Sequence, residues 1–287
     1  MGAAFGCTTC GAVFGRRNQE VPEDPDYDDP APAVGGPGAI FMVICTLDYK
    51  NTTAPLSCSV DGRNMLHLAQ CCMIPEQHVV VLVDEQCTKE NVANVIWNVG
   101  QQCRPLDYFI FYYSGHAVGV ADLSGDESDG QDEAFCFVDD TGKLSRDSVM
   151  IDDDFAEIMT TSLHEGVRTI ILTDCCHSGT IADFNAGDWH EREAISISGC
   201  LDSQKSGDIG CGGIFTHSML LAIADLTESQ EFDYSVGRLF NETLDKDRRV
   251  FNSRQDITLQ CAPRFMPNWM AWPLIPRGRY LPPYKKF

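Results

Sequence analysis

The chain has 287 residues, and 44% of them are hydrophobic, which is enough for a core in one large domain or two small ones. Its formal net charge of −21 excludes general binding to nucleic acids or anionic membranes, because phosphate recognition needs a basic surface. The charge is uneven. Residues 122–157 hold 13 acidic and two basic side chains, and residues 20–29 hold six acidic and no basic ones. This distribution suggests cations or basic substrates as partners.

The chain has 14 cysteines, but no secretory signal opens it, so disulfides are not indicated. The cysteines inside apolar runs, which are Cys45, Cys71, Cys72, Cys136 and Cys261, are predicted to be buried reduced thiols. No apolar run reaches the roughly 18–20 residues of a membrane helix, so a cytoplasmic location is expected. The N-terminus, from Gly2 to Cys7, partly resembles an acylation site, although Gly6 stands where Ser or Thr is preferred. Membrane association is expected only if this site is acylated, and the alternative is a plain flexible leader.

Residues 1–38 are predicted to be a flexible leader, since prolines, acids and a Gly-Gly pair leave no apolar period. Strand-like and helix-like segments then alternate. The predicted strands are 39–45, 78–84, 107–113, 168–174, 194–199 and 257–261, and the predicted helices are 61–72, 89–103, 152–163 and 214–226. This alternation predicts an α/β fold with a mainly parallel sheet covered by helices on both faces.

The C-terminal segment 263–287 is predicted to be a basic, proline-rich tail. It should run over the surface as extended chain anchored by Trp269 and Trp272, and a solvated tail is the alternative.

Candidate chemistry follows two of the predicted strands. One runs into His116, and the next into Asp174, Cys175, Cys176 and His177. A thiol nucleophile and its general base need this placement at the carboxyl ends of neighbouring strands. Side chains two apart share a face of a strand, so Cys176 is grouped with Asp174, while Cys175 points into the packing. His177 is adjacent to Cys176 and should project away from it, which makes His116 the better base.

At these motifs the sequence resembles the metacaspases, a family of caspase-like cysteine peptidases. The matching elements are YSGH at 113–116, DCCHSG at 174–179, CSVD at 58–61, DGQDE at 129–133, IDDD at 151–154 and ISGCLDSQKSGD at 197–208. The resemblance covers about 39–262, with a large-subunit region at 39–185 and a small-subunit region at 194–262. It implies a caspase-like fold and cysteine endopeptidase activity.

The resemblance assigns His116 as the catalytic histidine and Cys176 as the nucleophile. It implies an oxyanion site made of backbone N–H groups, which we place at Gly115 and Cys176. Self-cleavage at a basic residue between the two subunit regions is expected, with Arg192 or Lys205 as candidates.

The family's primary specificity pocket is acidic and takes Arg or Lys. Its positions match Cys58, Asp61, Ser114 and Asp174. The residues themselves agree with this reading, since Cys58 and Asp61 can share a helix face and Asp174 stands beside the nucleophile. Two carboxylates around a partly dry pocket favour a cationic side chain.

Many metacaspases need calcium, and the family's ligands map onto Asp132, Asp152, Asp153 and Asp183. Four carboxylates with water and carbonyl oxygens would satisfy Ca²⁺, which is expected as an activator. A solvated acidic loop is the alternative.

Peptides with Arg or Lys before the scissile bond are the expected partners, and family resemblance favours a monomer. Ala117 stands where the family commonly has glycine. Two rival functions stay open. One is a calcium-independent, paracaspase-like peptidase. The other is an inactive caspase-like fold acting as a calcium-responsive scaffold.

Overall fold

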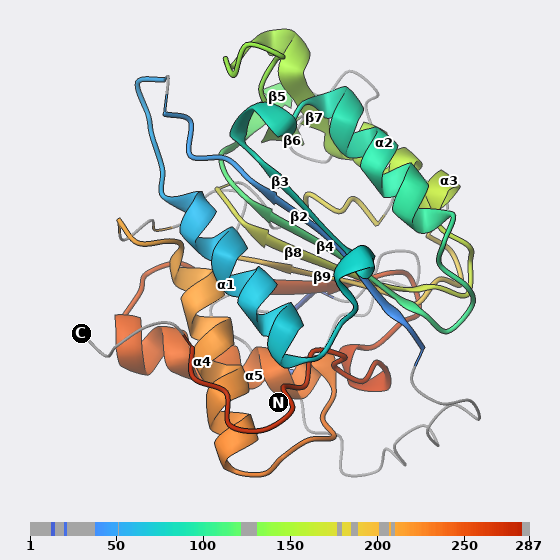
Figure 1. The fold of residues 1–287 in the computed structure, drawn as a ribbon, viewed down its shortest axis with the longest axis vertical. Coiled ribbons are helices and arrows are strands. Elements are labelled where there is room, and N and C mark those ends of the chain that lie inside the picture. The colour runs from blue at the N-terminus through green and yellow to red at the C-terminus, as the bar shows by residue number, and fades with distance from the viewer. Residues whose placement is uncertain are drawn as a thin grey trace, which may run out of the picture.

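The structure is a computed structural model that describes residues 13–14, 20–21, 38–50, 52–121, 131–176, 180–184, 189–200, 207 and 210–282. A seven-stranded sheet forms its centre, in the order β1-β10-β9-β8-β4-β2-β3 (Figure 1). Its strands are β1 (Val13–Phe14), β2 (Ile40–Thr46), β3 (Val79–Val83), β4 (Tyr108–Ser114), β8 (Arg168–Asp174), β9 (Ala194–Ser198) and β10 (Thr258–Cys261). The five strands from β9 to β3 are parallel, and β10 and β1 join antiparallel.

Helices cover both faces of the sheet, as the sequence predicts (Figure 1). α2 (Lys89–Gly100) and α3 (Asp152–Ser162) lie on one face. α1 (Cys58–Cys71), α4 (Ile214–Glu228) and α5 (Val236–Lys246) lie on the other. Short 3₁₀ segments occur at Glu76–His78, Asp84–Gln86, Arg146–Ser148 and Pro267–Trp269, and a π-helical turn, Asp247–Phe251, follows α5.

Strand β4 shows how the two layers of the core arise. Alternate side chains of a strand point to opposite faces. Phe109, Phe111 and Tyr113 therefore pack under α2 and α3, whereas Ile110 and Tyr112 pack under α4 and α5. All of them are buried, and each large apolar side chain contributes about 1.5–3 kcal/mol to the free energy of unfolding.

A small antiparallel sheet, β5-β6-β7, lies beside the main one and was not predicted (Figure 1). It consists of Ala117–Ala121, Gln131–Cys136 and Val149–Ile151. Asp132, a predicted calcium ligand, therefore lies on a strand and not in a solvated loop.

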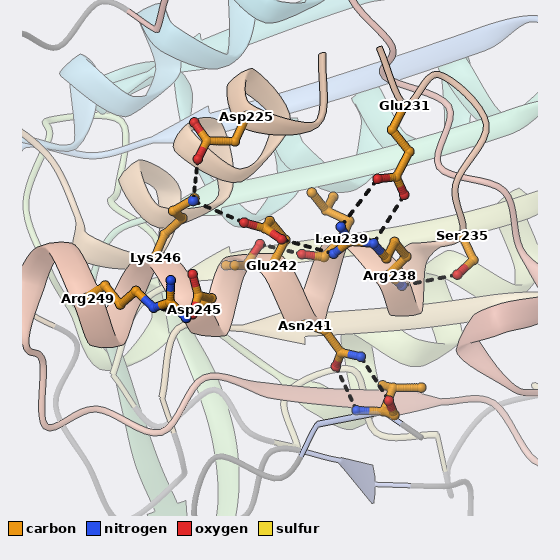
Figure 2. Close-up of polar contacts among 12 residues, drawn as sticks. Asp225, Glu231, Ser235, Arg238, Leu239, Asn241, Glu242, Asp245, Lys246 and Arg249 are labelled. Atoms are coloured by element: carbon orange, nitrogen blue, oxygen red, sulfur yellow. Dashed lines mark hydrogen bonds and ion pairs between the residues drawn. The ribbon is translucent and has the colours of Figure 1, made fainter. Parts of the chain in front are cut away.

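Parts of the expected leader and tail are built into the domain. β1 pairs with Leu259 and Gln260 of β10, and Val21 is buried. Asn241 of α5 accepts from the Val21 N–H at 2.7 Å and donates to its carbonyl at 2.8 Å, beside the charged residues of α5 (Figure 2). These contacts differ from a flexible leader at these positions, because the backbone groups find partners on the domain.

The described part of the tail is not a solvated segment. Trp272 and Tyr280 are buried against the α4 and α5 side of the core, and Ala271 forms a β-bridge with Ser235. Trp269 is half-buried and packs edge-on against Phe265. Over the described residues, no helix is both long and apolar enough to cross a membrane.

Candidate active site

The candidate site lies where β4 and β8 end side by side. Ser114 is paired with Asp174 in the parallel register, so the segments that follow both strands leave the sheet at one edge. A cavity of about 550 Å³ opens there. Its lining includes these predicted residues: Cys58, Ser114, Gly115, His116, Asp174 and Cys176. Asp61 lies directly behind Ser114, whose Oγ donates to Asp61 Oδ2 at 2.9 Å. The fold thus brings the predicted base, nucleophile and specificity residues to one place.

The His116 ring is held by a backbone carbonyl. His116 Nε2 lies 2.8 Å from the Ala54 carbonyl oxygen. That oxygen can only accept, so Nε2 carries the hydrogen and Nδ1 is the proton acceptor of the neutral ring. The Tyr49 ring packs against the imidazole with a centroid distance of 4.6 Å. These contacts fix both the tautomer and the ring plane.

Two buried tyrosines support the segment that carries His116. Tyr49 Oη accepts from the His116 N–H at 2.9 Å and donates to the Cys136 carbonyl at 2.6 Å. Tyr113 Oη donates to the His116 carbonyl at 2.6 Å. Burial raises the pKa of both hydroxyls well above the usual value, so both stay neutral donors. A Cβ on Gly115 would stand 2.6 Å from Tyr113 Oη, which explains the glycine.

The structure gives the Gly115 N–H a partner other than the predicted oxyanion. It donates to the Asp174 carbonyl oxygen at 3.4 Å, across the ends of β4 and β8. The Ala117 N–H is placed differently. Because Cys136 N–H donates to the His116 carbonyl at 3.0 Å, the next pair, Ala117 and Phe135, is not hydrogen-bonded. The N–H of Ala117 therefore points away from β6.

The two adjacent cysteines lie in different surroundings. Cys175 is 1% exposed and belongs to the core under α2 and α3, and its carbonyl accepts from Cys200 Sγ at 3.3 Å. Cys176 is half-buried and lines the cavity. The two side chains therefore point to opposite sides, as expected for adjacent residues at an extended strand end. His177 lies outside the described residues.

Asp61 and Asp174 are both buried and are held by the start of α4. Asp61 accepts from the Gly213 N–H, at 3.0 Å to Oδ2 and 3.2 Å to Oδ1. Asp174 Oδ2 accepts from both the N–H and the Oγ1 of Thr216, each at 2.8 Å. The helix N-terminus favours these negative charges. The two carboxylates also act on the nearby Tyr112. Burial, and then the negative charges of Asp61 and Asp174, raise the pKa of its hydroxyl.

Two glycines that the sequence reading missed allow this approach. A Cβ on Gly213 would stand 2.1 Å from Asp174 Oδ2. A Cβ on Gly212 would stand 2.2 Å from Asp61 Oδ1, and its φ of +112° also favours glycine. In the sequence, the Gly-Gly pair directly before the apolar helix that begins at Ile214 could have indicated this close approach.

The predicted calcium ligands come from three segments. Asp132 lies on β6, Asp152 and Asp153 open α3, and Asp183 follows the segment after Cys176. Asp132, Asp152 and Asp183 are buried. Burial, and then the charges of Asp183 and Asp132, raise the pKa of Asp152 to about 7. Within the described ranges, however, no three His, Cys, Asp or Glu side chains are gathered closely enough to hold a metal ion.

A comparison with known protein families matches the part of the chain that carries His116 and Cys176. Residues 42–185 match the family model described as "Metacaspase, peptidase C14 domain". The chain belongs to the metacaspase family. It is 30% identical to Metacaspase-1 of Arabidopsis thaliana over 196 residues, 58% of this chain and 52% of that protein. It is 29% identical to Metacaspase-2 of Trypanosoma brucei brucei over 252 residues, 74% of this chain and 69% of that protein.

The chain thus spans about half the length of the Arabidopsis metacaspase. A solved structure, protein GSU0716 from Geobacter sulfurreducens, matches with a TM-score of 0.59 and 22% identity, over 82% of this chain and 97% of that one. This match supports the fold alone. Together the matches confirm the caspase-like α/β fold and the membership of a peptidase family.

One of the two predicted self-cleavage sites is poorly placed in this metacaspase. Arg192 is 8% exposed, and its guanidinium donates to the carbonyls of Leu163 at 3.0 Å and Thr160 at 2.9 Å. A protease could reach this residue only after local unfolding. Lys205, the other candidate, lies outside the described residues.

Proposed function

We propose that the protein is a calcium-dependent cysteine endopeptidase that cleaves after Arg or Lys. The observation that carries this proposal is the shared cavity, where His116 and Cys176 stand with Ser114 and Asp174 of the acidic pocket. A nucleophile, a base and a charge-selective pocket are the groups that such a cleavage requires.

Cleavage begins when His116 Nδ1 takes the proton of the Cys176 thiol. The thiolate attacks the carbonyl carbon of the scissile bond, and His116 then gives the proton to the leaving amine. Water, deprotonated by the same imidazole, hydrolyses the thioester and restores the thiol. The Ala54 carbonyl keeps Nε2 protonated and so leaves Nδ1 as the working nitrogen.

Backbone N–H groups stabilise the oxyanion that forms at each step. The backbone N–H of Cys176 remains one of the two proposed oxyanion donors. Ala117 is the better second donor than Gly115, because its N–H points away from β6 while the Gly115 N–H meets the Asp174 carbonyl. A side chain at position 117 does not prevent this role, because the donor is the backbone.

The substrate's cationic side chain enters beside Ser114 and Asp174, with the charge of Asp61 behind them. Each charge-assisted hydrogen bond contributes about 1.5–3 kcal/mol, so acidic residues should be rejected strongly. The hydrogen bonds from Gly213 and Thr216 hold both carboxylates in a fixed orientation.

Asp132, Asp152, Asp153 and Asp183 would hold the calcium ion. The buried charges that raise the pKa of Asp152 repel one another, and a divalent cation would relieve that repulsion. When bound, Ca²⁺ would neutralise the charge of these carboxylates. The calcium-independent alternative is favoured by one observation, since the described carboxylates are not gathered at ligating distance.

A monomer is favoured because β1 pairs with the outer edge of β10, which would otherwise be open to a second copy. The protein is proposed to be cytoplasmic. The Gly2 and Cys7 acylation candidates lie outside the described residues.

A fluorogenic peptide assay tests the proposal. Peptides with Arg, Lys or Asp before the bond are compared in calcium and in chelator. Cleavage of the Arg and Lys peptides alone, and only with calcium, is expected. Cleavage that resists chelator would support the calcium-independent peptidase, and no cleavage of any peptide would support the inactive scaffold.

A further inference from the structure

Two exposed apolar side chains stand at the cavity, and the proposed chemistry uses neither. Among the described residues, eight large hydrophobic side chains are exposed, and Val118 (38%) and Leu144 (39%) are the two that line this cavity. Apolar side chains that stay exposed at the edge of a cavity are typical of a binding surface.

Both residues belong to the small-sheet side of the site. Val118 lies on β5, two residues after His116, and pairs with Ala134 of β6. Leu144 lies in the segment that joins β6 to β7. The acidic pocket is built instead from α1, the end of β8 and the start of α4. Figure 1 shows the small sheet on one side of the strand ends and α1 with α4 on the other.

The direction of the substrate follows from the chemistry. The basic side chain before the scissile bond lies in the acidic pocket, and His116 must reach the leaving amine to protonate it. The residue that carries this amine therefore lies on the His116 side of Cys176, toward β5. Ala54, whose carbonyl contacts the His116 ring, also lines the cavity and adds an apolar side chain beside the imidazole.

We propose that Val118 and Leu144 form a leaving-group subsite that selects an apolar residue directly after the scissile bond. This inference rests on the proposed function, because it requires cleavage by Cys176 and His116. An apolar residue would cover both side chains and remove apolar surface from water. The kcat/KM for a peptide with an apolar residue at this position should exceed that for a polar one by about tenfold. This is the lower limit of the discrimination that apolar pockets usually give.

The test uses internally quenched peptides that differ only in the residue after Arg, which is Leu, Gln or Glu. Leu and Gln are similar in volume, so their kcat/KM ratio reports apolarity, and Leu should be cleaved about tenfold faster. Val118→Lys and Leu144→Lys should each lower the Leu/Gln ratio and raise the Glu/Gln ratio. Phe232→Lys is the matched control, because Phe232 is 50% exposed and lies outside the cavity lining.

Each ratio is measured on one preparation, so it does not depend on the fraction of folded enzyme. Equal cleavage of the Leu and Gln peptides would overturn the subsite, as would Lys variants whose ratios match those of Phe232→Lys. In both cases cleavage after Arg would persist and the proposed function would stand. If no peptide were cleaved after Arg, the proposed function itself would fail, and the subsite with it.

Discussion

The Tyr49→Phe substitution removes one hydroxyl that connects three parts of the site. Tyr49 Oη accepts from the His116 N–H at 2.9 Å and donates to the Cys136 carbonyl at 2.6 Å, and it lies 3.0 Å from Tyr113 Oη. The hydroxyl bridges His116 and Cys136 where the β5–β6 ladder would otherwise close directly. Phenylalanine keeps the ring against the imidazole and loses only these bonds.

The magnitude follows from the groups left behind. A buried polar group without a partner costs about 1–3 kcal/mol. The His116 N–H loses its hydroxyl partner, while the Cys136 carbonyl keeps a longer contact of 3.4 Å with Tyr113. Tyr49→Phe should therefore lower the free energy of unfolding by about 2–3 kcal/mol. Because the His116 backbone is released, kcat should also fall, by roughly tenfold to a hundredfold, with a smaller change in KM.

Urea unfolding and peptide kinetics measure the two effects. Tyr234→Phe is the matched control, because Tyr234 is equally buried and its hydroxyl has no hydrogen-bond partner among the described residues. The control removes no hydrogen bond, so it should lower neither the free energy of unfolding nor kcat. Equal effects of the two substitutions would refute the reasoning, since burial and not hydrogen bonding would then explain them.

Three further predictions concern charge. Asp174→Asn should lower the preference for Arg over its neutral isostere citrulline by roughly tenfold to a hundredfold in kcat/KM, and an unchanged ratio would place the selective charge elsewhere. Burial raises the pKa of Asp247 to about 6, so the folded state holds this proton more tightly than the unfolded chain does. Its stability contribution is therefore lost as pH rises from about 4 to 6. Asp247→Asn should be the more stable protein above pH 6, by up to about 3 kcal/mol, and the gap should close below pH 4 in urea titrations. Asp152→Asn should raise the calcium concentration needed for half-maximal cleavage, and identical calcium titrations of wild type and variant would exclude Asp152 as a ligand.

Much of the main sheet could be predicted from apolar runs, because strands buried on both faces leave continuous hydrophobic segments. The strand Arg168–Asp174 is found at the predicted bounds. Helix α5 was not predicted although it is amphipathic and carries Arg238, Glu242 and Lys246 in ion pairs (Figure 2). The orientation of β10 was also not predictable, because the residue pattern of a four-residue strand does not show whether it pairs parallel or antiparallel.

The candidate site was predictable where chemistry depends on side-chain type, and less so where it depends on backbone. His116, Cys176 and the two buried aspartates stand at strand ends or helix starts that sequence patterns reveal. The Ala54 carbonyl has no sequence signature, because every residue carries one. The Gly115 N–H contact to Asp174 depends on the register of two strands distant in sequence, so only the structure could give it.

The central claim is that Cys176, and not its neighbour, is the nucleophile. The direct test is cleavage of a fluorogenic Arg peptide by Cys176→Ala and Cys175→Ala, prepared and assayed side by side in calcium. Cys176→Ala should abolish cleavage, whereas Cys175→Ala should keep much of it, because Cys175 is 1% exposed and serves packing. Full activity in Cys176→Ala, or complete loss in a folded Cys175→Ala alone, would contradict the account.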